Sequence, residues 1–266
     1  NWEYNLNFFK KSPSSRKLFL IKNEKNYGFA EGNNIGINFV LDHLNSDYIL
    51  LLNNDTVVDE NFLEELVKVG ESSDEVGCVG PKVYYYDFKG RKDVISFAGE
   101  KVNLYTSRGK RFGRNKVDKG QYDVMMETDK VEGCCMLIKT DVIRKVGMFD
   151  PTYFAYWEET DLCMRIKNAG FRLLYVPEAK IWHKIGMNWD NYFSYFVVYH
   201  YLVRNRLIFI WRYASNVQKT IFPVYFFFYL IGNIVLMLVK EDRENFKDVF
   251  KAIKNGIKGF KEINSS

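Results

Sequence analysis

The sequence is poor in cysteine and glutamine, with four and two residues respectively in a chain of 266. Its cysteines form no C-x-x-C pair and no spacing typical of a zinc site or a disulfide framework; they are Cys78, Cys134, Cys135 and Cys163. We therefore expect buried, reduced thiols, as in a cytosolic protein. The first 17 residues show no signal peptide, and a start at Asn1 rather than Met hints at a fragment.

An excess of basic charge is also absent from most of the chain. The formal net charge is +5, but from Asn191 onward 11 lysines and arginines stand against five acidic residues. The tail thus carries +6 and the first 190 residues carry −1. This distribution argues against a nucleic-acid partner for the main part of the protein. Aromatic residues, in contrast, make up 17% of the sequence and can fill a large core.

The stretch from Tyr48 to Thr56 reads YILLLNNDT. Five apolar or aromatic residues predict a central strand of a parallel sheet, buried on both faces. In open α/β sheets ligands bind beyond the carboxyl ends of strands, which is where Asp55 would lie. Asp55 could bind Mg²⁺ or Mn²⁺ together with phosphate oxygens. The alternative is a plain turn over residues 54–56, with Asp59 capping the next helix.

A loop rich in Gly and Asn, residues 26–36, lies between a short strand at 17–21 and an amphipathic helix. Strand, loop, helix and the 48–52 strand together make a βαβ unit. The loop begins near Gly28, and its backbone amides could bind phosphate. Its spacing is neither G-x-G-x-x-G nor a P-loop, so an ordinary helix-entry loop is the default interpretation.

Further elements are predicted along the chain: a helix at 59–70, a strand at 76–86, a hairpin at 93–105, a basic loop at 106–121, a strand at 130–139, a helix at 140–146, a helix from Trp157 and a strand at 171–176. The basic loop is either a solvated mobile segment or a lid over a diphosphate.

Acidic residues Glu158, Glu159 and Asp161 follow a run of aromatic residues that ends at Trp157. In the first turn of a helix they would be favoured by the helix dipole. Carboxylates among large aromatic rings are also desolvated, which raises a pKa and suits a general base. His183 lies just past a predicted strand end, where a structural role and a ligand role are about equally plausible.

The composition changes after Asn191. Residues 221–239 contain no charged side chain and are about the minimum length for crossing a bilayer. Residues 240–263 are amphipathic, with lysines beside one apolar face, which suits an anionic membrane surface. Alternatively, the tail packs on the main domain or on a partner chain.

Several segments resemble glycosyltransferase family 2, and within it the rhamnosyltransferase-like branch. In order they are NYGFAEGNNIGI, YILLLNNDTVVDENFLEEL, VGPKVYYYD, VEGCCMLIK, FDPTYFAYWEETDLCMRIKNAG and VPEAKIWHK. The resemblance covers residues 17–185, and the tail is similar to the membrane-associated end of that branch. It implies a GT-A fold, an α/β mixed sheet flanked by helices, over residues 1–190, followed by a hydrophobic and amphipathic helical tail over 191–266.

The resemblance also implies roles for single residues. Asn53, Asn54 and Asp55 stand where the family has its metal-binding D-x-D, so Asp55 and a nearby His183 would bind the divalent cation. Asn33 and Asn34 match a nucleotide-contacting loop, and Gly28 and Asn54 would also contact the donor. Glu159 matches the catalytic base, beside Glu158. Trp157 and Asp161 are expected to contact the acceptor; alternatively, Asp161 caps the helix or pairs with a basic residue and Glu158 contacts the acceptor.

The chain departs from the family at its start. Family members begin with a strand, a helix and a second strand that hold the nucleobase and ribose, and this sequence opens where those elements end. We favour a truncated chain over replacement of these elements by residues 1–16.

A processive polysaccharide synthase would need a Gln-x-x-Arg-Trp motif, which neither Gln121 nor Gln218 begins. A sugar nucleotidyltransferase would need a Gly-rich strand-to-helix loop with a basic residue, which this chain does not have. An inactive membrane-bound scaffold stays an alternative.

The resulting hypothesis is an inverting, metal-dependent glycosyltransferase. It would move a sugar, with rhamnose as one candidate, from a nucleotide-sugar donor to a lipid-linked or cell-surface glycan. We expect it at the cytoplasmic face of the cell membrane, attached peripherally or by a single span.

Overall fold

The computed structural model describes residues 6–8, 18–184, 195–239 and 243–265. Its helices are α1 (Gly28–His43), α2 (Phe62–Gly70), α3 (Thr140–Val146), α4 (Glu158–Asn168), α6 (Tyr195–Tyr213), α7 (Asn216–Val239) and α8 (Arg243–Ser265). Its strands are β1 (Leu6–Phe8), β2 (Phe19–Ile21), β3 (Tyr48–Leu52), β4 (Thr56–Val58), β5 (Val76–Tyr85), β6 (Val94–Phe97), β7 (Glu100–Asn103), β8 (Arg108–Arg111), β9 (Lys116–Val117), β10 (Met126–Glu127), β11 (Cys135–Lys139) and β12 (Arg172–His183).

The main sheet is mixed, as expected for the fold class, and its central path runs β10-β12-β5-β11-β3. Only the pairing of β12 with β5 along this path is parallel, while β11 runs antiparallel to both β5 and β3. The prediction that β3 is a central strand of a parallel sheet is therefore wrong. β3 ends the path, paired with β11 from Cys135↔Leu52 to Lys139↔Tyr48.

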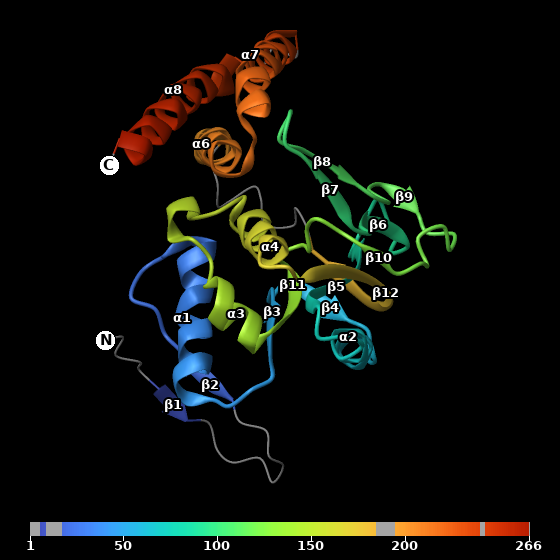
Figure 1. Cartoon of the computed structure of the whole chain (residues 1–266). Helices are drawn as coiled ribbons and strands as arrows, with labels where there is room; N and C mark the ends of the chain where they lie inside the picture. Colours follow the sequence, from blue (N-terminus) through green and yellow to red (C-terminus); the bar gives the residue numbers. More distant parts are fainter. Residues whose placement is uncertain (1–5, 9–17, 185–194, 240–242, 266) are drawn as a thin grey trace.

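Helices cover both faces of this sheet (Figure 1). On one face Ile49 and Leu51 of β3 pack into a core that also contains side chains of α1, α3 and α4. On the other face Tyr48 and Leu50 pack into the core that contains α2. The two helix layers thus explain the continuous apolar run of β3. Such a run reports burial on both faces and does not report which strands are neighbours.

The segment expected as a hairpin at 93–105 is not one. β6 pairs with β5 and β9, whereas β7 pairs with β8, so the two halves separate at Gly99, which has a positive φ of 91°. The basic loop expected at 106–121 contains β8 and β9 and is thereby tied to the sheet structure. β11 begins only at Cys135, and β12 extends to His183, beyond the expected end at 176.

All four cysteines are buried and free, which confirms the expected buried thiols.

The C-terminal helices pack against the main domain and against each other. Val203 and Phe209 of α6 share a core with Val249 and Ile253 of α8, and Trp157 packs against the same core. Part of the apolar face of α8 therefore covers α6, while α7 exposes large apolar side chains. These are Val217, Ile221, Val224, Phe227, Phe228, Ile231 and Val235.

No helix within the described residues is long and apolar enough to cross a membrane. The expected boundary between residues 190 and 191 lies outside the described residues.

Candidate active site

A cavity of about 1130 Å³ opens where the carboxyl ends of β3 and β12 meet the start of α4, the β7–β8 hairpin and α6. This volume suits a nucleotide sugar together with part of an acceptor, since ordinary small-molecule pockets span roughly 300–1,000 Å³. Of the residues predicted from the sequence, the cavity is lined by Asp55, Trp157, Glu158, Glu159 and His183.

Asp55 and His183 form one corner of the cavity. Asp55 follows β3 in a turn closed by hydrogen bonds from the Thr56 backbone N–H and hydroxyl to the Asn53 carbonyl. His183 is the last residue of β12, and its Nε2 lies 3.1 Å from Asp55 Oδ1. The backbone fixes this proximity, because β4 pairs with β12 at Thr56↔His183 and the Lys184 N–H donates to the Asp55 carbonyl.

This corner offers a divalent cation two donors. These are Asp55 Oδ1 and His183 Nε2, which lie 3.1 Å apart, and the Asp55 side chain is about one-third exposed, at 31%. Among the described residues no cluster of three or more His, Cys, Asp or Glu side chains could complete a metal site. The pair fits a cation such as Mg²⁺, which commonly takes one or two protein ligands plus water and substrate phosphates.

Glu158 and Glu159 are the first two residues of α4 and directly follow a strained turn. Phe154, Tyr156 and Trp157 all have positive φ values, of 60°, 66° and 77°, which non-glycine residues adopt at an energetic cost. This backbone path ends with Trp157 as the residue before the helix. The expected helix start near Trp157 is confirmed.

Lys130 separates the protonation states of the two carboxyl groups. Its Nζ lies 2.9 Å from Glu159 Oε1, and both side chains are largely buried. Burial raises the pKa of Glu159, but the ion pair with Lys130 outweighs it and holds that pKa below its usual range. Burial, and then the negative charge of Glu159, raise the pKa of Glu158 to about 9. The ion pair with Lys130 thus favours the ionised form of Glu159, while burial favours the protonated form of Glu158.

A second set of charges surrounds this pair. Arg111 of β8 forms ion pairs with Glu100 at 3.2 Å and with Glu132 at 2.9 Å. Lys130, Glu132 and Glu100 drew no functional prediction from the sequence, because each lies more than ten residues from its charged partner. Arg111 was assigned to a basic loop, and the structure instead fixes it on a strand facing two acids.

The strained turn before α4 is stabilised by α6. Asn205 is fully buried, and its Nδ2 donates to the carbonyls of Tyr153, Ala155 and Tyr156 at 2.7–2.8 Å. Arg204 also donates to the carbonyls of Thr152 and Tyr153. Positions in α6 were expected to belong to a membrane-associated tail, yet this helix supports the backbone that orients Glu158 and Glu159.

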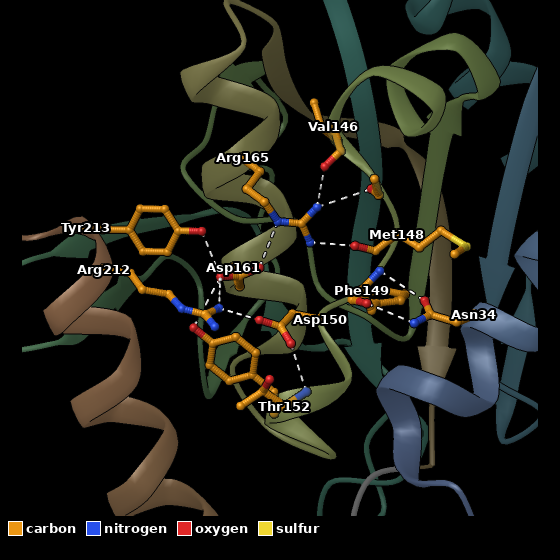
Figure 2. A network of polar contacts seen from close by, with 12 residues as sticks. Asn34, Val146, Met148, Phe149, Asp150, Thr152, Asp161, Arg165, Arg212 and Tyr213 are labelled. Atoms are coloured by element: carbon orange, nitrogen blue, oxygen red, sulfur yellow. Dashed lines mark hydrogen bonds and ion pairs between the residues drawn. The ribbon is translucent and has the colours of Figure 1, made fainter. Parts of the chain in front are cut away.

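Asp161 does not line the cavity, so its expected acceptor contact is not seen, whereas the alternative that it pairs with a basic residue is confirmed. Its side chain is 1% exposed and accepts hydrogen bonds from the Tyr153 and Tyr213 hydroxyls and from Arg165 Nε (Figure 2). Arg212 lies 3.4 Å away and bridges to Asp150. Asp161 thus joins α4 to α6.

The predicted donor-contacting residues also lie outside the cavity lining. The segment expected as a loop at 26–36 is helical from Gly28, whose N–H donates to Asn26 Oδ1. Phe154 packs against Gly28, and a Cβ there would lie 2.6 Å from the Phe154 side chain. The Asn33 amide donates to the Phe29 carbonyl within the helix.

The Asn34 side chain supports the turn that precedes α4. It accepts from the Phe149 N–H and donates to the Phe149 carbonyl, which uses both ends of its amide (Figure 2). Asn54 is exposed, and Asn53 lines the cavity in its place. The sequence therefore predicted segments that lie near the cavity, but the side chains it predicted within them do not line the cavity.

The family described as Glycosyltransferase like family 2 matches residues 6–195, which is most of the chain, and the chain belongs to this family. Rhamnosyltransferase WbbL of Escherichia coli is 28% identical over 68% of this chain and 72% of its own length. The low-salt glycan biosynthesis hexosyltransferase Agl10 of Haloferax volcanii is 26% identical over 56% of this chain. This chain spans 46% of the Haloferax protein.

Among solved structures, one similar protein is a mannosyltransferase from Pyrobaculum calidifontis in complex with GDP-Man and Mn²⁺. The alignment covers 89% of this chain and 67% of the mannosyltransferase chain. The TM-score is 0.46 at 11% identity, too low for ligand positions to be transferred.

Proposed function

We propose that this protein transfers a sugar from a nucleotide-sugar donor to a hydroxyl group of a lipid-linked or cell-surface glycan, with inversion at the anomeric carbon. The observation that best supports this function is the pair Glu158–Glu159 on the wall of a cavity large enough for both substrates, with Lys130 Nζ 2.9 Å from Glu159 Oε1. Family membership and the similarity to a rhamnosyltransferase and a hexosyltransferase support the same class of reaction.

Glu159 is the proposed general base. It takes the proton of the acceptor hydroxyl while that oxygen attacks the anomeric carbon. The new glycosidic bond forms as the bond to the diphosphate breaks, and the nucleoside diphosphate leaves with the electron pair. A base must be unprotonated at working pH, and Lys130 keeps Glu159 in that state. Trp157, which also lines the cavity, offers an aromatic face for a sugar ring.

Asp55 and His183 are the proposed ligands of a Mg²⁺ or Mn²⁺ ion that also binds the donor diphosphate. When bound, such an ion supplies positive charge that stabilises the leaving diphosphate. In the absence of the ion, the chain itself positions the two side chains through the β4–β12 pairing and the turn after β3.

We propose peripheral attachment to the cytoplasmic face of the cell membrane through the C-terminal helices. α7 exposes a set of apolar residues that includes Val224, Phe228 and Ile231, spaced along one side of the helix. The lysines at 247, 251, 254, 258 and 261 of the neighbouring α8 are exposed. Apolar insertion together with attraction to anionic lipids is the usual basis of such binding.

The experiment that tests this function compares two isosteric variants, Glu159→Gln and Glu158→Gln. Transfer from a panel of nucleotide sugars to a lipid-linked acceptor is measured as kcat and KM. Glu159→Gln is expected to lower kcat by about 10²–10⁴ with little change in donor KM, because it removes only the base. Glu158→Gln mimics an acid that is already protonated and should cost much less turnover.

A larger loss of kcat in Glu158→Gln than in Glu159→Gln would assign the base to Glu158. Wild-type protein that transfers no sugar from any donor in the panel would contradict the proposed function.

A further inference from the structure

Two arginines on the cavity wall formed by β8 and α6 have no carboxylate partner in the part of the chain that the structure describes. Arg108 comes from β8 and Arg206 from α6, and both line the cavity. No ion pair joins either of them to an acidic side chain of the described residues. Arg206 Nε is buried and makes no hydrogen bond. An unsatisfied, buried guanidinium nitrogen is costly, so its retention beside a cavity points to a ligand.

The other cations near the two carboxyl groups differ in this respect. Arg111 is neutralised by Glu100 and Glu132, and Lys130 by Glu159. Arg108 and Arg206, in contrast, contact aromatic rings and form no ion pair with a carboxylate of the described residues. Two neighbouring like charges repel one another, and an anion between or beside them removes that repulsion.

Aromatic rings fix the positions of both guanidinium groups. The Arg108 and Arg206 guanidinium carbons lie 5.1 Å and 4.8 Å from the centre of the Tyr229 ring of α7. Arg206 also lies over Trp157 at 5.8 Å, and Arg108 over Tyr225 at 5.9 Å. A guanidinium group over a ring keeps its in-plane N–H donors available, and these donors match phosphate oxygens in pairs.

We propose that Arg108 and Arg206 form an anion site for the phosphate or diphosphate group of a lipid-linked acceptor. This inference rests on the proposed transferase function and adds the substrate group that this wall recognises. The donor end of the cavity is the Asp55–His183 corner, formed by the ends of β3 and β12. The two arginines belong instead to the wall formed by β8 and α6 and are held by rings of α7.

The position of α7 favours the acceptor as the source of the phosphate. Its Tyr225 and Tyr229 face the arginines, while Val224, Phe227 and Phe228 are 59–65% exposed. A lipid chain attached to the bound phosphate would therefore find apolar surface on the same helix. In a lipid-linked sugar the phosphate lies between lipid and sugar, which matches a site between α7 and Glu159.

The first test measures binding of inorganic pyrophosphate to the full chain by titration calorimetry in EDTA, so that no divalent cation contributes. Arg108→Gln and Arg206→Gln are each expected to weaken binding about tenfold or more, as for loss of a charged hydrogen-bond donor. Arg206→Lys keeps the charge but loses the paired N–H donors, so it should restore only part of the affinity lost in Arg206→Gln. Arg91→Gln, an exposed arginine paired with Asp93 outside the cavity, is the matched control and should bind like wild type.

Arg206 packs against rings, and its Gln variant could lose stability. Arg108 is exposed, so Arg108→Gln provides the test without that complication. Pyrophosphate binding that is equal in wild type, Arg108→Gln and Arg206→Gln would overturn the proposal.

The second test separates acceptor from donor. With a diphosphate-linked prenyl sugar as acceptor, Arg108→Gln is expected to raise acceptor KM about tenfold or more. Donor KM, and the KM for a neutral alkyl glycoside of the same sugar, should not change. A rise in donor KM instead would assign the arginines to the donor and overturn the proposal. Absence of all transfer would refute the transferase function, whereas unchanged pyrophosphate binding would refute only the anion site.

Discussion

Replacement of Lys130 by Met is expected to move the working pH range of the enzyme upward. Lys130 Nζ lies 2.9 Å from Glu159 Oε1, and the two side chains are 11% and 15% exposed. Methionine keeps a similar length and removes the charge. Glu159 then remains buried beside Glu158 without the cation paired with it, so burial raises its pKa, and the charge of Arg111 and a backbone hydrogen bond offset only part of that rise. The acidic limb of the pH–rate profile should shift up by about one pH unit or more.

The same change should alter how stability depends on pH. In the wild type the folded-state pKa of Glu159 is lowered, so its ion pair stabilises the fold above the unfolded pKa of about 4.3 and is lost as pH falls through the folded pKa. In Lys130→Met the folded-state pKa lies above the unfolded value, so stability is lost as pH rises. The difference in unfolding free energy between the wild type and Lys130→Met should widen from about pH 4 upward.

The size of the loss follows from the burial of the pair. Removing one partner of a buried ion pair costs about 3–5 kcal/mol, and uptake of a proton by Glu159 limits the loss near neutral pH. Urea unfolding at several pH values measures it, alongside the rate of sugar transfer over the same range. Lys101→Met is the control, because Lys101 is 48% exposed and its pair with Asp129 should contribute about 1 kcal/mol or less. An unshifted acidic limb in Lys130→Met would refute the proposed control of Glu159 by Lys130.

Three further changes test other parts of the molecule. Asp55→Ala should abolish divalent-dependent transfer while circular dichroism stays unchanged, and substantial metal-stimulated activity in that variant would exclude Asp55 as the ligand. Asn205→Leu removes the hydrogen bonds from the Asn205 amide to three carbonyls of the turn before α4 and should cost about 3 kcal/mol in urea unfolding and lower kcat; wild-type values for both would mean that the turn holds its shape unaided. Phe228→Glu should reduce sedimentation with anionic vesicles, whereas Leu18→Glu, at an equally exposed position on another part of the chain, should not; equal sedimentation of both would place the membrane contact elsewhere.

The order and type of most elements could be predicted from the sequence. The apolar run at 48–52, the helix at 140–146 and the helix starting beside Trp157 all form as expected. Local patterns of apolar residues and turn residues decide these features, because they depend on neighbours along the chain. The same local reasoning placed Asp55 at a strand end and the acidic pair Glu158–Glu159 at a helix start, and both line the cavity.

Only the tertiary structure decided how these residues work together. β3 and β11 pair across more than 80 residues, and no local pattern specifies that pairing or its direction. Asp161 and Glu159 look alike in the sequence, yet one is enclosed by Tyr153, Tyr213 and Arg165 and the other faces the cavity. Charge interactions depend on distance through space and on burial, and neither is written into the spacing of residues along a chain. For that reason the sequence does not show that Lys130, 29 residues away along the chain, lies 2.9 Å from Glu159 and lowers its pKa.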